Sequence, residues 1–231
     1  VGGTKTWLGL FSDASPRPEL VEARRYPTLE SDGLAGLIGR FLQETSVQKG
    51  QIRNAAVGVA GPVEHNSSNL TNVPWRVEGD KLGQTHGWGP VLVINDLVAM
   101  AYAVPHLRDA EVAVLQAGEP TRAGAVALIA PGTHLGEASL HRVGNDWVAL
   151  PSEGGHADFA ARTATELELV ADLRATLGHV GRGELLSGPG LVRFHRHAHR
   201  DMPCLSRHGE PPNAAAVAAA ALEPRCAGCE R

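Results

Sequence analysis

The sequence predicts an α/β protein, in which helices pack against strands of a sheet. Two short apolar runs, 91–94 and 125–130, have the length and composition of strands buried between helices. Residues 34–42 instead carry apolar side chains at helical spacing. A chain of 231 residues can form one large domain or two small ones. We therefore place a soft boundary near residue 105, with a small α/β domain over 1–105 and part of a larger one over 106–231.

The composition excludes several classes of partner. Lys and Arg total 21 against 25 Asp and Glu, a net charge of -4, so no basic field attracts nucleic acid or an anionic membrane. No apolar run reaches the roughly 18 to 20 residues of a membrane span, and no basic segment of a signal peptide opens the chain. Three cysteines, an odd number, argue against a disulfide scaffold and favour a cytoplasmic location.

The first residues, Val-Gly-Gly-Thr, precede a strand that we expect to begin at Thr6. Gly2 and Gly3 would let backbone N–H groups approach a ligand closely, and Thr4 adds a hydroxyl, a combination that suits phosphate. Taken alone, the same residues are better explained by an ordinary Gly-Gly turn, because short glycine motifs often occur without a ligand. The Ser-, Asp- and Pro-rich segment 12–18 predicts a hairpin loop, followed by a returning strand over 20–26.

Residues 34–42 predict a core-facing helix, because their apolar side chains fall on one face. Residues 54–63 predict a strand that ends in a Gly-Pro turn. Trp75, in a loop, either lines a polar pocket or packs as buried area, and the sequence leaves both open.

The strand predicted over 91–94 ends on two polar side chains, Asn95 and Asp96. Good helix formers without Gly or Pro follow over 97–104. In α/β sheets, ligands bind at the carboxyl ends of strands, where such helices begin. Asp96 is therefore placed to act as a carboxylate base or to cap the helix.

In the second half, the strand over 125–130 runs into Gly132 and Thr133, a loop comparable to the first glycine-rich one. Two such loops could hold two ends of one phosphate chain. A predicted hairpin over 138–150 is followed by Glu153 and His156, which flank a pair of glycines. These groups suit hydrogen bonding to a polyhydroxylated ligand better than a metal, which would need more ligands at defined spacing.

The remaining segments are mainly helical. Residues 163–177 predict an amphipathic helix capped by Thr163 or Thr165, and 213–222 an alanine-rich helix. His195 and His199 would share a helix face, but arginines surround them, so we expect a solvated basic face rather than a metal site. Cys226-x-x-Cys229 lacks a second ligand pair, so two neighbouring thiols are favoured over zinc. The chain's end on a helical segment predicts a missing continuation.

These motifs, in this order, resemble those of the bacterial glucokinases of the hexokinase type, from the first residue to the last. The motifs are Val1-Gly2-Gly3-Thr4, Val59-Ala60-Gly61-Pro62-Val63, Thr71-Asn72 with Trp75, Ile94-Asn95-Asp96, Gly132-Thr133 with Leu135-Gly136, Glu153-Gly154-Gly155-His156 with Asp158-Phe159, Leu186-Ser187-Gly188-Pro189-Gly190-Leu191, and Cys226-x-x-Cys229.

The resemblance implies an actin-like, ribonuclease-H-like two-domain sugar kinase fold, C-terminally truncated, that closes over glucose with ATP and Mg²⁺. It implies ATP-dependent phosphorylation of glucose at the 6-hydroxyl to glucose 6-phosphate, the first step of glycolysis, and leaves a homodimer open. Its implied site residues fall into three groups. Asp96 would be the base and Asn95 would hold neighbouring hydroxyls; Glu153, His156 and Glu184 would bind the sugar; Gly2, Gly3, Thr4, Gly132 and Thr133 would hold phosphate.

The chain departs from the family's pattern at four places, one of which is its end at the helix expected to carry Cys226-x-x-Cys229, without the family's adenosine-binding region and final helix. The family's Asp directly before the Val-Gly-Gly-Thr block would precede Val1. His134 stands where the second phosphate loop has its middle glycine, and Gly183 stands where a sugar-binding Glu is expected, with Glu184 one residue later. These departures favour one alternative, a homologue or fragment that binds glucose but does not hold ATP productively. A metal-dependent hydrolase using the histidine-rich segment is not favoured, because the ligand spacing is missing.

Overall fold

The computed structural model describes residues 1–14, 17–70, 73–119, 124–201, 203–204, 213–222 and 226. The chain forms two compact units, the first over 1–125 with 140–149 and the second over 126–139 with 150–231. It passes from one unit to the other three times, first at residue 125. The domain boundary that we placed near residue 105 stays a prediction.

The first unit begins with the predicted hairpin. Strand β1 (Lys5–Phe11) pairs with β2 (Leu20–Pro27) in antiparallel register. The other regular elements of this unit are η1 (Thr28–Glu30), α1 (Leu34–Glu44), η2 (Lys49–Gln51), β3 (Ala55–Val59), β4 (Ser67–Asn69), β5 (Arg76–Glu78), α2 (Gly79–His86), β6 (Val91–Asn95), α3 (Asp96–Ala103), η3 (Val104–His106) and η4 (Asp109–Glu111).

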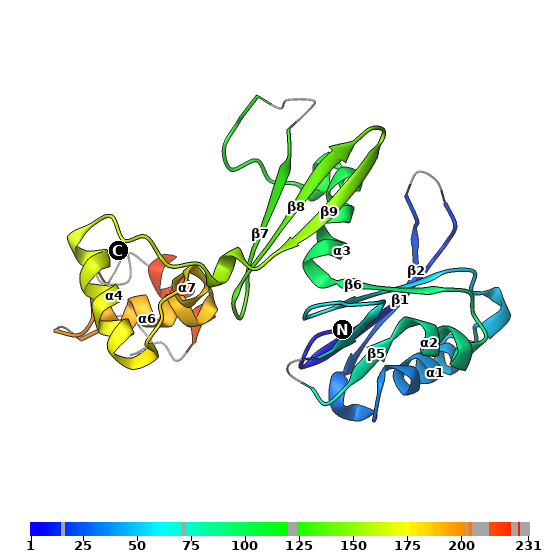
Figure 1. Cartoon of the computed structure of the whole chain (residues 1–231). Helices are drawn as coiled ribbons and strands as arrows, with labels where there is room; N and C mark the ends of the chain where they lie inside the picture. The colour runs from blue at the N-terminus through cyan, green and yellow to red at the C-terminus, as the bar shows by residue number, and fades with distance from the viewer. Residues whose placement is uncertain are drawn as a thin grey trace. The chain divides into compact units, whose positions relative to one another are not determined.

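Helix α1 covers the core of this unit, as its periodicity predicts. Its apolar face is fully buried, and α1 lies beside α2, which contacts β5 and β6 (Figure 1). Trp75 is only 5% exposed and belongs to the same core, so packing explains it and a polar pocket does not. Its motif neighbours Thr71 and Asn72 lie outside the described residues.

Strands β3 and β6 run parallel, with Val59 opposite Asn95 at their carboxyl ends. The turn after β3 therefore meets the start of α3, as expected for an α/β sheet. One detail of the prediction was wrong. Leu92, in the middle of β6, is 55% exposed, so the strand is buried on one face and not on both.

The second unit contains most of a three-stranded sheet and a group of helices. The strands are β7 (Val126–Pro131), β8 (Leu135–Val143) and β9 (Asp146–Ser152), and the helices are η5 (Gly154–His156), α4 (Ala164–Leu177), α5 (Arg182–Leu185), α6 (Gly188–Ala198) and α7 (Ala214–Leu222). Strands β8 and β9 form the predicted hairpin and continue into the first unit. Strand β7 also alternates in burial, and Ile129 is 65% exposed, so the fully buried strand expected there was wrong.

Local signals set the ends of the helices in this unit. Thr163 is the N-cap of α4, and Thr163 and Glu166 form a reciprocal capping box, which decides between the two predicted caps. The Ser-Gly-Pro-Gly motif starts α6, because Ser187 accepts a hydrogen bond from the Gly190 N–H at 3.1 Å. Figure 1 shows α6 next to α7, which it contacts. None of the helices described combines the length and apolar character needed to cross a membrane.

Candidate functional site

Asn95 caps helix α3. Its Oδ1 accepts hydrogen bonds from the N–H groups of Leu97 at 2.9 Å and Val98 at 3.2 Å, and its Nδ2 donates to the Gly61 carbonyl at 3.1 Å. Gly61 has φ +143°, a conformation that side chains with a Cβ rarely adopt. The Gly-Pro turn after β3 and the start of α3 are therefore joined through one amide side chain.

Asp96 is consequently not needed as the cap. Its Oδ1 accepts from the Leu97 N–H at 3.0 Å, and its Oδ2 has no hydrogen-bond partner among the described residues. Burial raises the pKa of this half-buried carboxyl, while the Leu97 N–H and the amino group of Val1 act in the opposite direction. The result is a carboxylate with one oxygen available and a basicity above that of an ordinary aspartate.

The first glycine-rich loop lies in the same unit and is tied to Thr28. The Thr28 hydroxyl donates to the Gly2 carbonyl at 2.8 Å, and the Thr28 N–H donates to the Thr4 carbonyl at 3.1 Å. The Gly2 N–H is used within the loop, donating to the Lys5 carbonyl. The N–H groups of Gly3 and Thr4 make no hydrogen bond within the described chain, so these two amides are the ones able to bind an anion.

The second loop, at Gly132 and Thr133, lies in the other unit. The Gly132 N–H donates to the His134 carbonyl at 2.9 Å, and the Gly132 carbonyl accepts from the Gly188 N–H at 2.9 Å. The loop is thus fixed to the start of α6. Thr133 is exposed, and neither its N–H nor its hydroxyl bonds to any other residue that the structure describes.

The predicted sugar-binding side chains of the second unit surround η5. Glu153 and His156 lie 3.7 Å apart between Oε2 and Nε2, and both side chains are largely exposed. His156 stacks on His134, with ring centroids 4.4 Å apart. Gly155 lies so close to the backbone of Leu135 that any Cβ would collide with it, which explains the second glycine of this motif.

The two unusual residues of the second unit fit each other. The imidazole of His134 occupies the space directly over Gly183, where a Cβ would overlap the ring atoms. A glutamate at position 183 could not coexist with His134 in this position, so the two departures from the family's pattern compensate one another. Sequence reasoning missed this contact, because 49 positions separate the two residues and no local pattern links them.

Glu184 is held in an ion pair, so it is not available to replace the glutamate expected at position 183. Its carboxylate pairs with Arg193 of α6 at 2.8 Å, and the same guanidinium donates to the Glu184 carbonyl at 2.7 Å. The side chain of Arg193 is 25% exposed and that of Glu184 is 30% exposed. Glu184 therefore links α5 to α6 in this structure.

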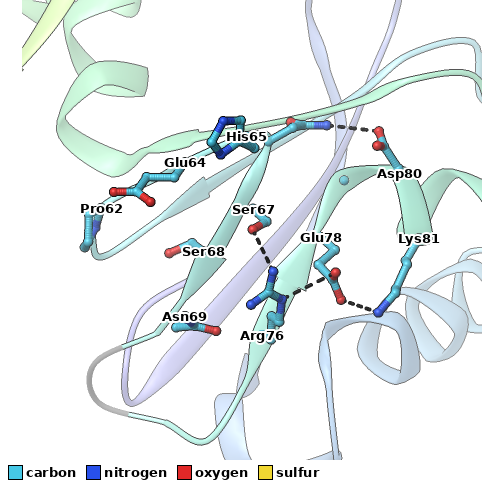
Figure 2. A pocket seen from close by; sticks show the side chains of 12 residues that line it. Pro62, Glu64, His65, Ser67, Ser68, Asn69, Arg76, Glu78, Asp80 and Lys81 are labelled. Atoms are coloured by element: carbon cyan, nitrogen blue, oxygen red, sulfur yellow. Dashed lines mark hydrogen bonds and ion pairs between the residues drawn. The ribbon is translucent and has the colours of Figure 1, made fainter.

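A polar pocket of about 620 Å³ lies in the first unit, and sequence reasoning did not predict it. Figure 2 shows Arg76 between the Ser67 hydroxyl and Glu78, with Lys81 paired to Glu78 at 2.6 Å. None of the predicted site residues lines this pocket. Both cations of the lining, Arg76 and Lys81, pair with Glu78, and the lining also holds Glu64 and Asp80, so the pocket carries no positive charge free to bind a phosphate.

Comparisons with known proteins agree with these motifs. The glucokinase family profile matches residues 1–231. The chain is 32% identical to a glucokinase of Salmonella arizonae over all of its own 231 residues, which make up 70% of that protein, and equally similar to one of Salmonella heidelberg.

Among solved structures, a glucokinase from an Antarctic psychrotroph superposes with a TM-score of 0.81 at 26% identity, covering 100% of this chain and 71% of that one. A Balamuthia mandrillaris glucokinase in complex with glucose superposes with a TM-score of 0.68 at 17% identity, covering 100% and 69%, and supports the fold alone.

Proposed function

Because this chain belongs to the glucokinase family of hexose-kinase phosphotransferases, we propose that it transfers the terminal phosphoryl group of ATP to the 6-hydroxyl of glucose. The observation that carries this proposal is the state of Asp96. It is half-buried, it stands at the carboxyl end of a strand, and one of its carboxylate oxygens is available. Phosphoryl transfer asks a protein mainly for positioning, charge stabilisation and one oriented base.

In this mechanism Asp96 accepts the proton of the sugar's 6-hydroxyl as that oxygen attacks phosphorus. A raised pKa makes a carboxylate a better proton acceptor near neutral pH. Asn95 fixes the position of Asp96 by capping α3 and by binding the Gly61 carbonyl. The base is thus held through hydrogen bonds that the Asn95 side chain makes with backbone groups of α3 and of Gly61.

Glucose recognition is proposed for Glu153 and His156, with Glu184 as a further candidate. Paired polar groups recognise hydroxyls and reject analogues that lack them, because an unpaired buried group is costly. His134, stacked on His156, restricts the orientation of that imidazole. Glu184 can contribute only if its ion pair with Arg193 opens, so its role is the weakest of the three.

ATP is proposed to bind at the two glycine-rich loops. The amides of Gly3, Thr4 and Thr133 fit phosphate oxygens, since the described chain leaves their N–H groups unbonded. Mg²⁺, when bound with ATP, would neutralise charge on the phosphates. Asp96 would remain the proton acceptor, and the loops would orient the nucleotide.

A second candidate function is glucose binding without phosphoryl transfer. It is favoured by His134, whose side chain stands where the family's loop has a glycine and could crowd the phosphates. The two functions differ in one measurable respect. A protein that only binds glucose retains glucose affinity at Glu153 and His156, but adding ATP produces no glucose 6-phosphate.

Calorimetric titration with glucose, with and without Mg-ATP, followed by a coupled assay for glucose 6-phosphate, separates them. Turnover that disappears in Asp96→Asn supports the kinase. Glucose binding with no turnover in the wild type would reject it in favour of the second candidate. A cytoplasmic location and a homodimer remain proposals, which cell fractionation and analytical ultracentrifugation test.

A further inference from the structure

Two histidines of α6 and two cysteines beyond it lie in one cluster within the second unit. His195 stands in the last turn of α6 and is 3% exposed, and His199 is the residue at its C-cap. The side-chain ligand atoms of His195, His199 and Cys204 all lie within 4.8 Å of one another. Cys226 joins them, since its Sγ is 3.1 Å from His199 Nε2. The solvated basic face expected for these histidines was therefore wrong.

Of the three arginines that seemed to oppose a cation, Arg193 and Arg200 are engaged elsewhere, and Arg196 is exposed. Arg193 pairs with Glu184, and Arg200 pairs with Glu168 at 3.1 Å and with Asp172 at 3.5 Å. A solvated face was expected because these cations flank the histidines in sequence. The guanidinium groups of Arg193 and Arg200 instead form ion pairs with carboxylates of α4 and α5.

The spacing of two histidine–cysteine pairs, His195 with Cys204 and His199 with Cys226, fits a small thiophilic cation. Zinc has Zn–S bonds of about 2.3 Å and Zn–N bonds of about 2.0 Å, so a tetrahedral site separates its N and S ligands by about 3.5 Å. His195 Nε2 is 3.4 Å from Cys204 Sγ, and His199 Nε2 is 3.1 Å from Cys226 Sγ. Each pair is within a few tenths of an ångström of that requirement.

The surroundings of the cluster also suit a metal. His199 Nδ1 lies 2.8 Å from the His195 carbonyl, so an N–H there donates to it and Nε2 carries the lone pair that faces Cys226. The carboxyl end of a helix dipole favours positive charge, and both histidines stand at that end of α6. The two rings stack with centroids 4.1 Å apart, which aligns them on one side of the cluster.

We propose that His195, His199, Cys204 and Cys226 form a structural site for Zn²⁺ or a similar thiophilic divalent cation. Four protein ligands of the Cys₂His₂ type leave no open position for a substrate, so the site is structural and not catalytic. On binding, the two thiols release their protons to solvent and coordinate as thiolates. The ion would join the end of α6 to the segments that carry Cys204 and Cys226.

Cobalt titration of the full chain, stripped with a chelator and kept in a reductant, tests this proposal. Co²⁺ bound by thiolates in a tetrahedral site gives intense visible d–d bands and a thiolate charge-transfer band, which Zn²⁺ then removes by displacement. We expect one tightly bound ion per chain. Absence of these bands, or a Cys204–Cys226 disulfide found by mass spectrometry in the reduced sample, would overturn the proposal.

Variants locate the site. In Cys204→Ser and His199→Ala we expect a loss of affinity larger than the roughly 10–100-fold that losing an outer hydrogen bond costs. His197→Gln is the matched control, because His197 lies between the two ligands on α6 but pairs with Asp172 at 3.2 Å. Cobalt binding that survives in the cluster variants, or that disappears in His197→Gln, would place the ion elsewhere.

A measurement on the unmodified chain covers the case in which a variant does not fold. Bound Zn²⁺ stabilises the folded state by mass action, so the midpoint of thermal unfolding should rise with zinc concentration and fall with a chelator. An unfolding midpoint unaffected by either reagent would also contradict the proposal. Neither readout depends on catalytic activity, so failure of the proposed kinase function would leave this test intact.

Discussion

The two units support their site residues in different ways. In the first, the side chain of Asn95 binds backbone groups of α3 and of the turn after β3, and Asp96 stands beside it half-buried. In the second, the side chains of Glu153 and His156 are 81% and 66% exposed, and their nearest support is another side chain, His134. A site held by backbone tolerates little change, whereas one held by side-chain packing can be altered by paired substitutions such as His134 with Gly183.

The largest effect is expected at Asp96. Asp96→Asn keeps an oxygen that can accept from the Leu97 N–H but removes the proton acceptor, so kcat should fall by about 10²–10⁴-fold with little change in the KM for glucose. The coupled glucose 6-phosphate assay measures this. The free energy of unfolding should change little, because Asn95 provides the cap. An activity within a few-fold of wild type would exclude Asp96 as the base.

Gly183→Ala should have the next largest effect, in the second unit. Its Cβ would overlap the His134 imidazole, and overpacking of this kind costs about 1–3 kcal/mol. In a His134→Gly background the same substitution should cost far less, so urea unfolding of the four proteins in this double-mutant cycle should reveal a coupling of similar size. Additive effects would show that the two residues do not compensate each other.

Asn95→Ala should destabilise the first unit by about 0.5–2 kcal/mol, because helix α3 loses its cap. Urea unfolding measures the change. Asn95→Asp is the comparison variant, since it keeps the capping oxygen and replaces the donor to the Gly61 carbonyl with a carboxylate oxygen. If wild type, Asn95→Ala and Asn95→Asp were equally stable, the Asn95 side chain would not contribute to the stability of helix α3.

The smallest effect is a dependence of stability on pH. The pKa of Asp96 is raised in the folded state above its ordinary value of 3.8, so the folded state holds this proton more tightly than the unfolded state. The stability of wild type relative to Asp96→Asn should be greatest below pH 3.8 and should decrease as pH rises through the folded-state pKa. The unfolding midpoints of wild type and Asp96→Asn, measured across this pH range, test the prediction. If the stability of wild type relative to Asp96→Asn increased with pH, the raised pKa would be contradicted.

Features that depend on neighbouring residues were predictable from the sequence. The apolar periodicity of α1, the hairpin of β1 and β2, and a threonine cap of α4 at Thr163 or Thr165 all follow from residues a few positions apart. The polar pair at the end of β6 was likewise found by its strand pattern. The sequence left open whether Asp96 caps the helix, because that depends on which of two adjacent side chains points at the helix N-terminus.

Features that depend on distant residues were not predictable in this way. The burial of His195 depends on Cys204 and on ion pairs that turn Arg193 and Arg200 away, and neither follows from the spacing of α6 alone. The alternating exposure of Leu92 and Ile129 was missed because a continuous apolar run predicts burial on both faces. The fit of His134 over Gly183 depends on a contact that only the folded chain brings about.

The hydrogen bond from Asn95 to the Gly61 carbonyl closes a loop of 34 residues. Parallel strands such as β3 and β6 pair only after the intervening chain has been ordered, so this contact is costly to form early in folding. The amide of Leu97, held between Asn95 and Asp96, should therefore exchange its hydrogen with solvent only when β3 and β6 separate. Its exchange rate would report the opening of the strand pair that supports the Asp96 carboxylate.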